Sequence, residues 1–151
     1  MSSRVQAGDF DLQHEYAEVV NEAGDAGAVV LFTGLVREFH AADDKEAVVS
    51  LTLEHYPGMT EKALAEIESQ ACSRWPLLST RIVHRVGEMK AHEQIVFVAA
   101  ASAHRHAAFE AAQFMMDFLK SRAPFWKKQA SASGSIWVDS RESDSAALER
   151  W

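Results

Sequence analysis

The feature that most constrains this fold is a long apolar segment, residues 103–121, which ends just before a proline. Its spacing predicts a helix that is apolar on two sides, with one stripe made by Ala108, Ala111, Met115, Phe118 and Leu119 and a neighbouring stripe made by Phe109, Ala112 and Met116. Such a helix must bury both sides, one against its own sheet and one against another surface. Pro124 cannot continue the helix, and it forces Ala123 toward an extended conformation. The chain is therefore expected to turn there.

The remaining sequence alternates between strand-like and helix-like segments. Helices are expected at 11–23 and 60–74, and a short one within 141–151, with Thr60 and Ser102 as the N-caps of the 60–74 and 103–121 helices. Strands are expected at 28–33, 48–55, 81–86 and 95–101, with a hairpin formed by 126–131 and 135–139. The apolar run 28–33 is expected to be buried, and the polar segment 38–46 to be an exposed loop. This order predicts an α+β fold in a single domain, 1–151.

The composition argues against several classes of protein. The formal net charge of the 151 residues is -7, whereas proteins that bind nucleic acid are usually basic. The N-terminus has no apolar secretory signal, and no apolar run approaches the ~18 residues of a membrane span. A single cysteine suits a reducing compartment, so a cytoplasmic protein is expected. His104 and His106 would point to opposite sides of a helix, and no metal-binding motif is present, so no metal is expected.

Basic residues gather at both ends of the long helix. His104 and Arg105 lie in the first turn, where backbone N–H groups and the helix dipole favour an anion. Lys120 lies near the other end, where a cation stabilises the helix through its dipole, so this lysine is also explained without a ligand. Arg105 and Lys120 are roughly 22 Å apart along a helix, too far for one small ligand. Either there are two anion sites, or a second copy of the chain supplies one end, and we favour a homodimer because it would also cover the second apolar stripe.

Lys127 follows the turn at Pro124 and is expected to fold back near Lys120. Ammonium groups held together in a partly dry pocket lose their protons more readily. A neutral lysine can act as a nucleophile or proton carrier, so this pair is a candidate for catalysis.

Several segments of the sequence resemble the large, catalytic subunit of molybdopterin synthase. The three that carry the resemblance are Leu53–Leu64, Ser102–Arg105 and Lys120–Lys128, and those that also fit are Val29–Gly34 with Arg37, Ile82–Glu88 and Trp137–Asp144. The similarity covers about residues 27–144. It implies an α/β-hammerhead fold with an added antiparallel β segment. It also implies a homodimer, with one small ubiquitin-like sulfur-carrier subunit bound to each copy, and no cofactor.

The activity implied by the resemblance is sulfur transfer. The carrier's C-terminal Gly-Gly thiocarboxylate would give two sulfurs in turn to cyclic pyranopterin monophosphate, forming molybdopterin. By matching position, Lys120 and Lys127 are the implied catalytic lysines. The residues implied to bind the substrate, besides these two lysines, are Arg37, His104, Arg105, Lys128, Gln129 and Arg141. The side chains expected to line the pocket are those of Phe32, Leu35, Val36 and Met116.

The sequence departs from the family pattern at two positions. Leu35 stands where members often carry a lysine, and Gln129 stands where an acidic residue is common. The chain ends in Glu149-Arg150-Trp151 and not in Gly-Gly, so it is expected to be the acceptor side of the pair of subunits and not the carrier. Two other functions stay open at this point. One is a non-catalytic module that binds a ubiquitin-like partner through a basic and aromatic patch, and the other is an anion-binding homodimer with different chemistry.

Overall fold

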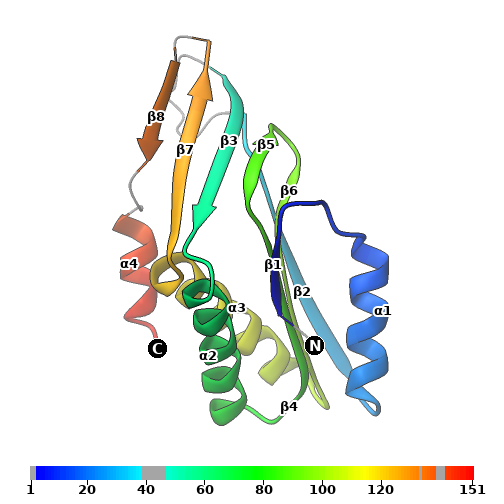
Figure 1. Ribbon diagram of the computed structural model, residues 1–151. Coiled ribbons are helices and arrows are strands. Elements are labelled where there is room, and N and C mark those ends of the chain that lie inside the picture. Colours follow the sequence, from blue (N-terminus) through cyan, green and yellow to red (C-terminus); the bar gives the residue numbers. More distant parts are fainter. Residues whose placement is uncertain (1–2, 39–46, 133, 139–141) are drawn as a thin grey trace.

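The computed structural model describes residues 3–38, 47–132, 134–138 and 142–151. Its helices and strands are β1 (Arg4–Gln6), α1 (Leu12–Ala23), β2 (Ala28–Leu35), β3 (Val48–His55), α2 (Met59–Arg74), β4 (Leu77–Arg85), β5 (Gly87–Lys90), β6 (Gln94–Ser102), α3 (Arg105–Arg122), β7 (Phe125–Ser131), β8 (Gly134–Val138) and α4 (Glu142–Leu148). They form two four-stranded sheets, ordered β1-β4-β6-β2 and β5-β3-β7-β8, with helices beside them (Figure 1). This arrangement confirms the predicted α+β class. The second sheet is antiparallel throughout and corresponds to the expected added β segment.

Helices cover both faces of the first sheet, with α1 on one face and α2 and α3 on the other (Figure 1). Alternate residues of β6 explain the two layers of the core. Val96 and Val98 pack with Phe114 of α3, whereas Phe97 and Ala99 belong to the cluster that contains α1. A strand that is buried on both faces has a continuous apolar sequence, which is the pattern of β6.

The strand β2 has an equally apolar sequence but lies at an edge of the first sheet. Leu31 and Phe32 are 37% and 42% exposed, so the expectation of a buried strand is wrong. The sequence could not distinguish β2 from β6, because the strand order of a sheet is set by long-range pairing. An exposed apolar edge strand is a surface suited to another protein chain.

The two N-caps expected from the sequence are also wrong. Gly58 precedes α2, and its N–H donates to a carboxylate oxygen of Glu61 at 2.6 Å. Thr60 lies inside the helix, fully buried, and its hydroxyl donates to the carbonyl of Tyr56 at 3.0 Å. Ser102 ends β6, and its hydroxyl donates to the carbonyl of His104, which is the true N-cap of α3. In both cases a hydroxyl expected to accept from a helix N–H donates to a nearby carbonyl instead.

The chain passes from the first sheet to the second at Gly87. This residue has a φ of 89°, which only glycine adopts without strain, and it is the first residue of β5, two positions after the end of β4. The predicted strand 81–86 is therefore part of the longer β4, and β5 was not predicted. Where the two sheets meet, Val36, Leu51, Leu53 and Met89 form a small apolar cluster.

The C-terminal part of the chain agrees with its predicted elements. β7 and β8 form the expected hairpin, and α4 is the expected short last helix. Residues 39–46 of the predicted loop 38–46 lie outside the described part of the chain. None of the helices in the described ranges is long and apolar enough to cross a membrane.

Candidate active site

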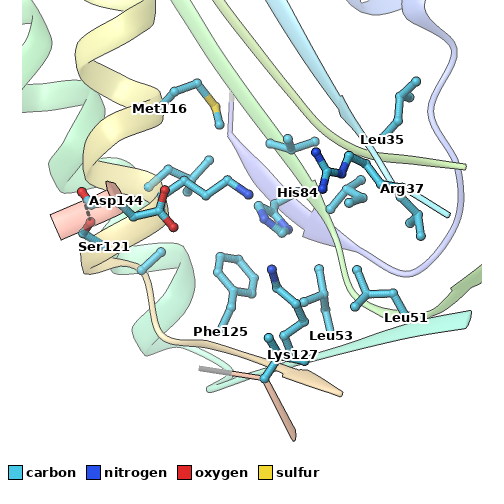
Figure 2. Close-up of a pocket in the computed structure, with 17 residues that line it drawn as sticks. Leu35, Arg37, Leu51, Leu53, His84, Met116, Ser121, Phe125, Lys127 and Asp144 are labelled. Atoms are coloured by element: carbon cyan, nitrogen blue, oxygen red, sulfur yellow. Dashed lines mark hydrogen bonds between the residues drawn. The ribbon is translucent and has the colours of Figure 1, made fainter. Parts of the chain in front are cut away.

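A cavity of about 360 Å³ lies between the C-terminal end of α3 and the junction of the two sheets (Figure 2). We call it the lysine pocket. Most of the residues that line it are apolar, and they come from both sheets and from α3, with Leu51, Leu53, Ile95, Leu119 and Phe125 among them. The polar side chains in the wall are those of Arg37, His84, Lys120, Ser121, Lys127 and Asp144. Three cations thus line one small cavity in a chain whose net charge is -7.

The turn at Pro124 brings Lys120 and Lys127 to the same cavity, as predicted. Lys120 lies in the last turn of α3, and Ala123 ends the helix in an extended conformation with φ -77° and ψ 135°. β7 begins at once with Phe125, and because side chains alternate along a strand, Phe125 and Lys127 share a face. Lys127 pairs with Leu53 on one side and Val138 on the other, which places it in the middle of the second sheet.

Arg37 reaches the pocket from the end of β2. The register of β2 against β6 shifts between Gly34 and Leu35, and the chain then leaves the strand. The backbone of Val36 is fixed there, because its N–H donates to the carbonyl of Glu93 at 2.9 Å and its carbonyl accepts from the N–H of His92 at 2.7 Å. Leu35, Val36 and Met116 all line the pocket, as expected from the sequence.

His84 is a member of the pocket for which the sequence analysis gave no role. Its imidazole stacks on the ring of Phe125, with centroids 3.9 Å apart and planes 19° apart, and its Nδ1 lies 2.8 Å from the carbonyl oxygen of Arg85. The pKa of His84 is lowered to about 4, mainly by burial and further by the charges of Lys120 and His55. The hydrogen bond with Arg85 acts in the opposite direction and raises the pKa. The pocket therefore contains a neutral histidine at physiological pH.

Ser121 and Asp144 were also not singled out from the sequence. The Ser121 hydroxyl donates to the backbone carbonyl of Asp144 at 3.0 Å, so it ties α4 to the end of α3. No short-range pattern indicates this, because α4 is brought to the pocket by tertiary contacts alone. Arg141, an expected contributor, lies outside the described residues.

Three other residues expected at the site lie elsewhere. Among the residues that the structure describes, Phe32, Lys128 and Gln129 are absent from the wall of the lysine pocket. Phe32 lies on the edge strand β2, and Lys128 points to the opposite face of the second sheet, with its Nζ 5.7 Å from the ring centroid of Trp137. Gln129 lies opposite Leu51 and is further along β7 than the pocket.

His104 and Arg105 lie at the other end of α3, in a second hollow that also includes Gly27, His106 and Phe109. We call it the helix-start hollow. Both residues are exposed, as is Phe109, which is 59% accessible. Within one chain, therefore, His104 and Arg105 do not meet Lys120 and Lys127. Across the described ranges, no group of three or more His, Cys, Asp or Glu side chains is arranged to hold a metal ion.

Comparison with known proteins identifies the family. The model of the MoaE protein family matches residues 5–122. The molybdopterin synthase catalytic subunit of Escherichia coli is 54% identical over 142 residues, which cover 94% of this chain and 92% of that protein. The subunit of the same name from Vibrio cholerae is 52% identical over 147 residues, covering 97% and 95%. The solved structure of a molybdopterin biosynthesis MoaE protein from Burkholderia ambifaria matches with a TM-score of 0.84 at 46% identity, covering 99% of this chain and 97% of that one. The chain therefore belongs to the MoaE protein family.

Proposed function

We propose that this chain is the catalytic subunit of a molybdopterin synthase. It transfers two sulfurs from the C-terminal thiocarboxylate of a small ubiquitin-like carrier to cyclic pyranopterin monophosphate. The observation that carries this proposal is the lysine pocket, where Arg37, Lys120 and Lys127 line an otherwise mostly apolar cavity of about 360 Å³. A thiocarboxylate is an anion, and positive groups held together in a small cavity stabilise an anion more strongly than the same groups would in bulk water.

Lys120 and Lys127 are the catalytic residues in this proposal. Their amines lie where negative charge develops on the oxygen or sulfur of the carrier's terminal group during transfer. They stabilise that charge, and Lys120 also serves as proton donor or transient nucleophile. The apolar wall, with Leu35, Val36 and Met116, limits access of water to the thiocarboxylate and so limits hydrolysis.

Arg37, His104 and Arg105 bind the substrate in this proposal. Further candidates are Arg141 and two residues outside the wall of the lysine pocket, Lys128 and Gln129. The guanidinium of Arg105 suits the cyclic phosphate, because guanidinium groups bind phosphate oxygens in a bidentate manner. The backbone N–H groups at the start of α3 add to this, since they point toward an anion bound there. Among the described residues, no side-chain hydrogen bond caps this end of α3.

The site is shared between two copies of the chain in this proposal. One copy contributes Lys120 and Lys127, and the partner copy contributes His104 and Arg105. Phe109, at the helix-start hollow, and Phe32, on the edge strand β2, are 59% and 42% exposed, which supports this arrangement. Large apolar side chains on the surface are suited to contact with another protein.

The carrier tail enters from the side of the second sheet in this proposal. Leu35, which lines the pocket, and Ile136 of β8 are 52% and 65% exposed and offer apolar contacts to a partner. Ile136 pairs with Gln129, two residues along β7 from Lys127.

We assign residues 1–151 to one domain and the protein to the cytoplasm, where its one cysteine stays reduced.

The experiment that tests this function uses purified chain, thiocarboxylated carrier and cyclic pyranopterin monophosphate, with molybdopterin measured as the product. Lys120→Ala is expected to lower turnover by about 10²–10³-fold, the loss typical of removing a group that stabilises transition-state charge. Carrier binding is expected to persist. Lys62→Ala, which removes an exposed lysine of α2, is the matched control. A wild-type chain that binds carrier but forms no molybdopterin would favour the non-catalytic module instead.

A further inference from the structure

The short helix α4 contributes to the lysine pocket but cannot hold its own position. Asp144, in the first turn of α4, lines the pocket, and the helix lies against α3 (Figure 1). α4 has only 7 residues, and an isolated helix of that length is not stable in water. Its position must therefore come from contacts with the rest of the molecule.

Trp151, three residues past the end of α4, makes such contacts with both α2 and α3. Its indole packs at a steep angle against the rings of Trp75 and Phe114, with centroids 5.6 Å away in each case. The indole Nε1 donates a hydrogen bond to Oδ2 of Asp117 at 2.7 Å, and the backbone oxygen of Trp151 accepts one from Arg74 at 3.1 Å. Aromatic packing and hydrogen bonds thus hold the same residue.

The carboxylate of Asp117 makes the contact specific for an indole. Asp117 is only 7% exposed, and its other oxygen, Oδ1, accepts from Nε2 of Gln113 at 2.9 Å. A buried carboxylate is costly unless its oxygens accept hydrogen bonds. An apolar ring at position 151 would fill the same space but would leave Oδ2 without this donor.

Trp151 is joined to α4 by backbone hydrogen bonds. The N–H groups of residues 149–151 each donate to the carbonyl three positions earlier, at 3.2, 3.3 and 3.1 Å. Bonds of this spacing continue the helix as a tight turn. Holding Trp151 therefore also fixes α4, although Trp151 itself lies outside the wall of the lysine pocket.

The other end of α4 is tied to the turn of α3 that carries Lys120. The Ser121 hydroxyl donates to the backbone carbonyl of Asp144 at 3.0 Å, and Ser121 directly follows Lys120 in the last turn of α3. The last turn of a helix opens readily, because its final carbonyls have no partners within the helix. A tie from outside the helix restrains that turn.

We propose that Trp151 is a positioning residue of the lysine pocket. It fixes α4, and α4 restrains the last turn of α3 through the bond between Ser121 and Asp144, so the backbone that carries Lys120 keeps its place. The proposal rests on the proposed function, because Lys120 is the lysine assigned to the transfer. Trp151 acts through α4 and not through contact with the reacting groups.

The first measurement is amide hydrogen exchange, which does not depend on molybdopterin formation. In Trp151→Ala, exchange is expected to be about tenfold faster in residues 142–151 and several-fold faster in the last turn of α3, because both segments lose their restraint. Trp151→Phe keeps an apolar ring without the N–H donor, so about a threefold change is expected in residues 142–151. Val19→Ala is the control, a buried change beside the opposite face of the first sheet that should leave both segments unchanged.

Unchanged exchange of the last turn of α3 in Trp151→Ala would overturn the proposal at any turnover. If Trp151→Ala does not fold, Trp151→Phe decides in its place, and unchanged exchange of residues 142–151 in that variant would overturn the proposal.

The second measurement is turnover at saturating carrier and pyranopterin, well below the melting temperature of each variant. Trp151→Ala is expected to lower kcat about tenfold with little change in KM, as a misplaced catalytic group does. Val19→Ala should keep the wild-type kcat. A role in stability alone predicts that both variants keep it, and this result would overturn the proposal.

A double variant tests whether the two ties act along one path. Ser121→Ala removes the tie at the other end of α4 and is expected to lower kcat about three- to tenfold. The double variant with Trp151→Ala should lose no more kcat than Trp151→Ala alone, because both changes act on Lys120 through α4. Losses that multiply would mean independent routes and would overturn the proposal. If the wild type forms no molybdopterin, the proposed function fails, and the exchange rates still decide whether Trp151 fixes α4 and the end of α3.

Discussion

The two ends of α3 carry similar charges in very different surroundings. At the C-terminal end, Lys120 faces a pocket with a mostly apolar wall, beside a buried neutral histidine and two further cations. At the N-terminal end, His104 and Arg105 are exposed and lie in an open hollow next to the exposed ring of Phe109. One end forms a cavity within a single chain, and the other has basic groups and an apolar ring that are exposed among the described residues.

The helix dipole sharpens this contrast. A cation near the C-terminus of a helix stabilises it, whereas a cation in the first turn is mildly unfavourable. Arg105 at the start of α3 therefore costs the isolated helix a little stability, and a ligand anion at that position would offset the cost. The proposed function explains this contrast as a division of labour, in which the enclosed end performs the chemistry and the open end binds the phosphate of the substrate in the pocket of a partner copy.

The largest effect is expected at the enclosed end. Lys127→Ala is expected to lower kcat by about 10²–10³-fold, because it removes a positive group from the site where negative charge develops. The KM for pyranopterin should change little. Lys90→Ala removes an exposed lysine from β5 of the same sheet and is the matched control. If Lys127→Ala raised KM and left kcat intact, the enclosed end would be a binding site and the contrast between the two ends would break.

A smaller effect of a different kind is expected at the open end. Arg105→Ala should raise the KM for pyranopterin by about 10- to 100-fold and leave kcat nearly intact, because a phosphate contact that is equal in substrate and transition state contributes to binding alone. Arg122→Ala removes an exposed arginine from the last turn of the same helix and serves as its control. A fall in kcat at an unchanged KM would assign Arg105 to the chemistry instead.

Mixing the two variants tests whether the site is shared. In a dimer of one Lys127→Ala chain and one Arg105→Ala chain, a shared arrangement leaves one of the two sites with both residues intact. At a pyranopterin concentration well below the raised KM of Arg105→Ala, where neither variant alone has much activity, random exchange of chains should then restore about a quarter of wild-type turnover, since about half of the dimers are mixed. If each site lies within one chain, mixing restores nothing.

Local patterns in the sequence located the elements but not their neighbours. The two-sided helix, the turn at Pro124 and the hairpin of β7 and β8 follow from periodicity and from the chemistry of proline, and all three are present. The edge position of β2 depends on which strands pair over long distances, so its apolar sequence was read as buried. The N-caps were misassigned because serine and threonine hydroxyls can donate to nearby carbonyls as readily as they accept from a helix.

The same limit applies to the site. Lys120 and Lys127 could be paired from sequence, because a proline between them reverses the chain within a few residues. His84 is 36 positions before Lys120, and in the sequence it resembles any other polar residue of a strand. Its place in the pocket depends on a tertiary contact, the stacking of its ring on Phe125 of the second sheet. A signal was present in the predicted strand 81–86, where His84 lies between the apolar residues Ile82 and Val86 in the alternation of the strand.

The enclosed end should also make stability depend on pH through His84. Its pKa is about 4 in the folded protein against 6.5 in the unfolded chain, so the unfolded state binds more protons between these values and stability falls as pH falls from 6.5 to 4. Between pH 7 and pH 5 the free energy of unfolding should drop by about 2 kcal/mol on this account, and His84→Gln should lack that drop. Urea unfolding at the two pH values measures this drop. Both pH values lie above the lowered pKa values of Glu18 and Glu93, so these two carboxylates stay charged throughout.

The control is Ile82→Val, a buried change in the same strand. It should lower the free energy of unfolding by about 1 kcal/mol at both pH values and keep the wild-type drop. Equal pH dependence in wild type and His84→Gln would mean that the imidazole is not held neutral, and the enclosed end would then be more open to water than its apolar wall indicates.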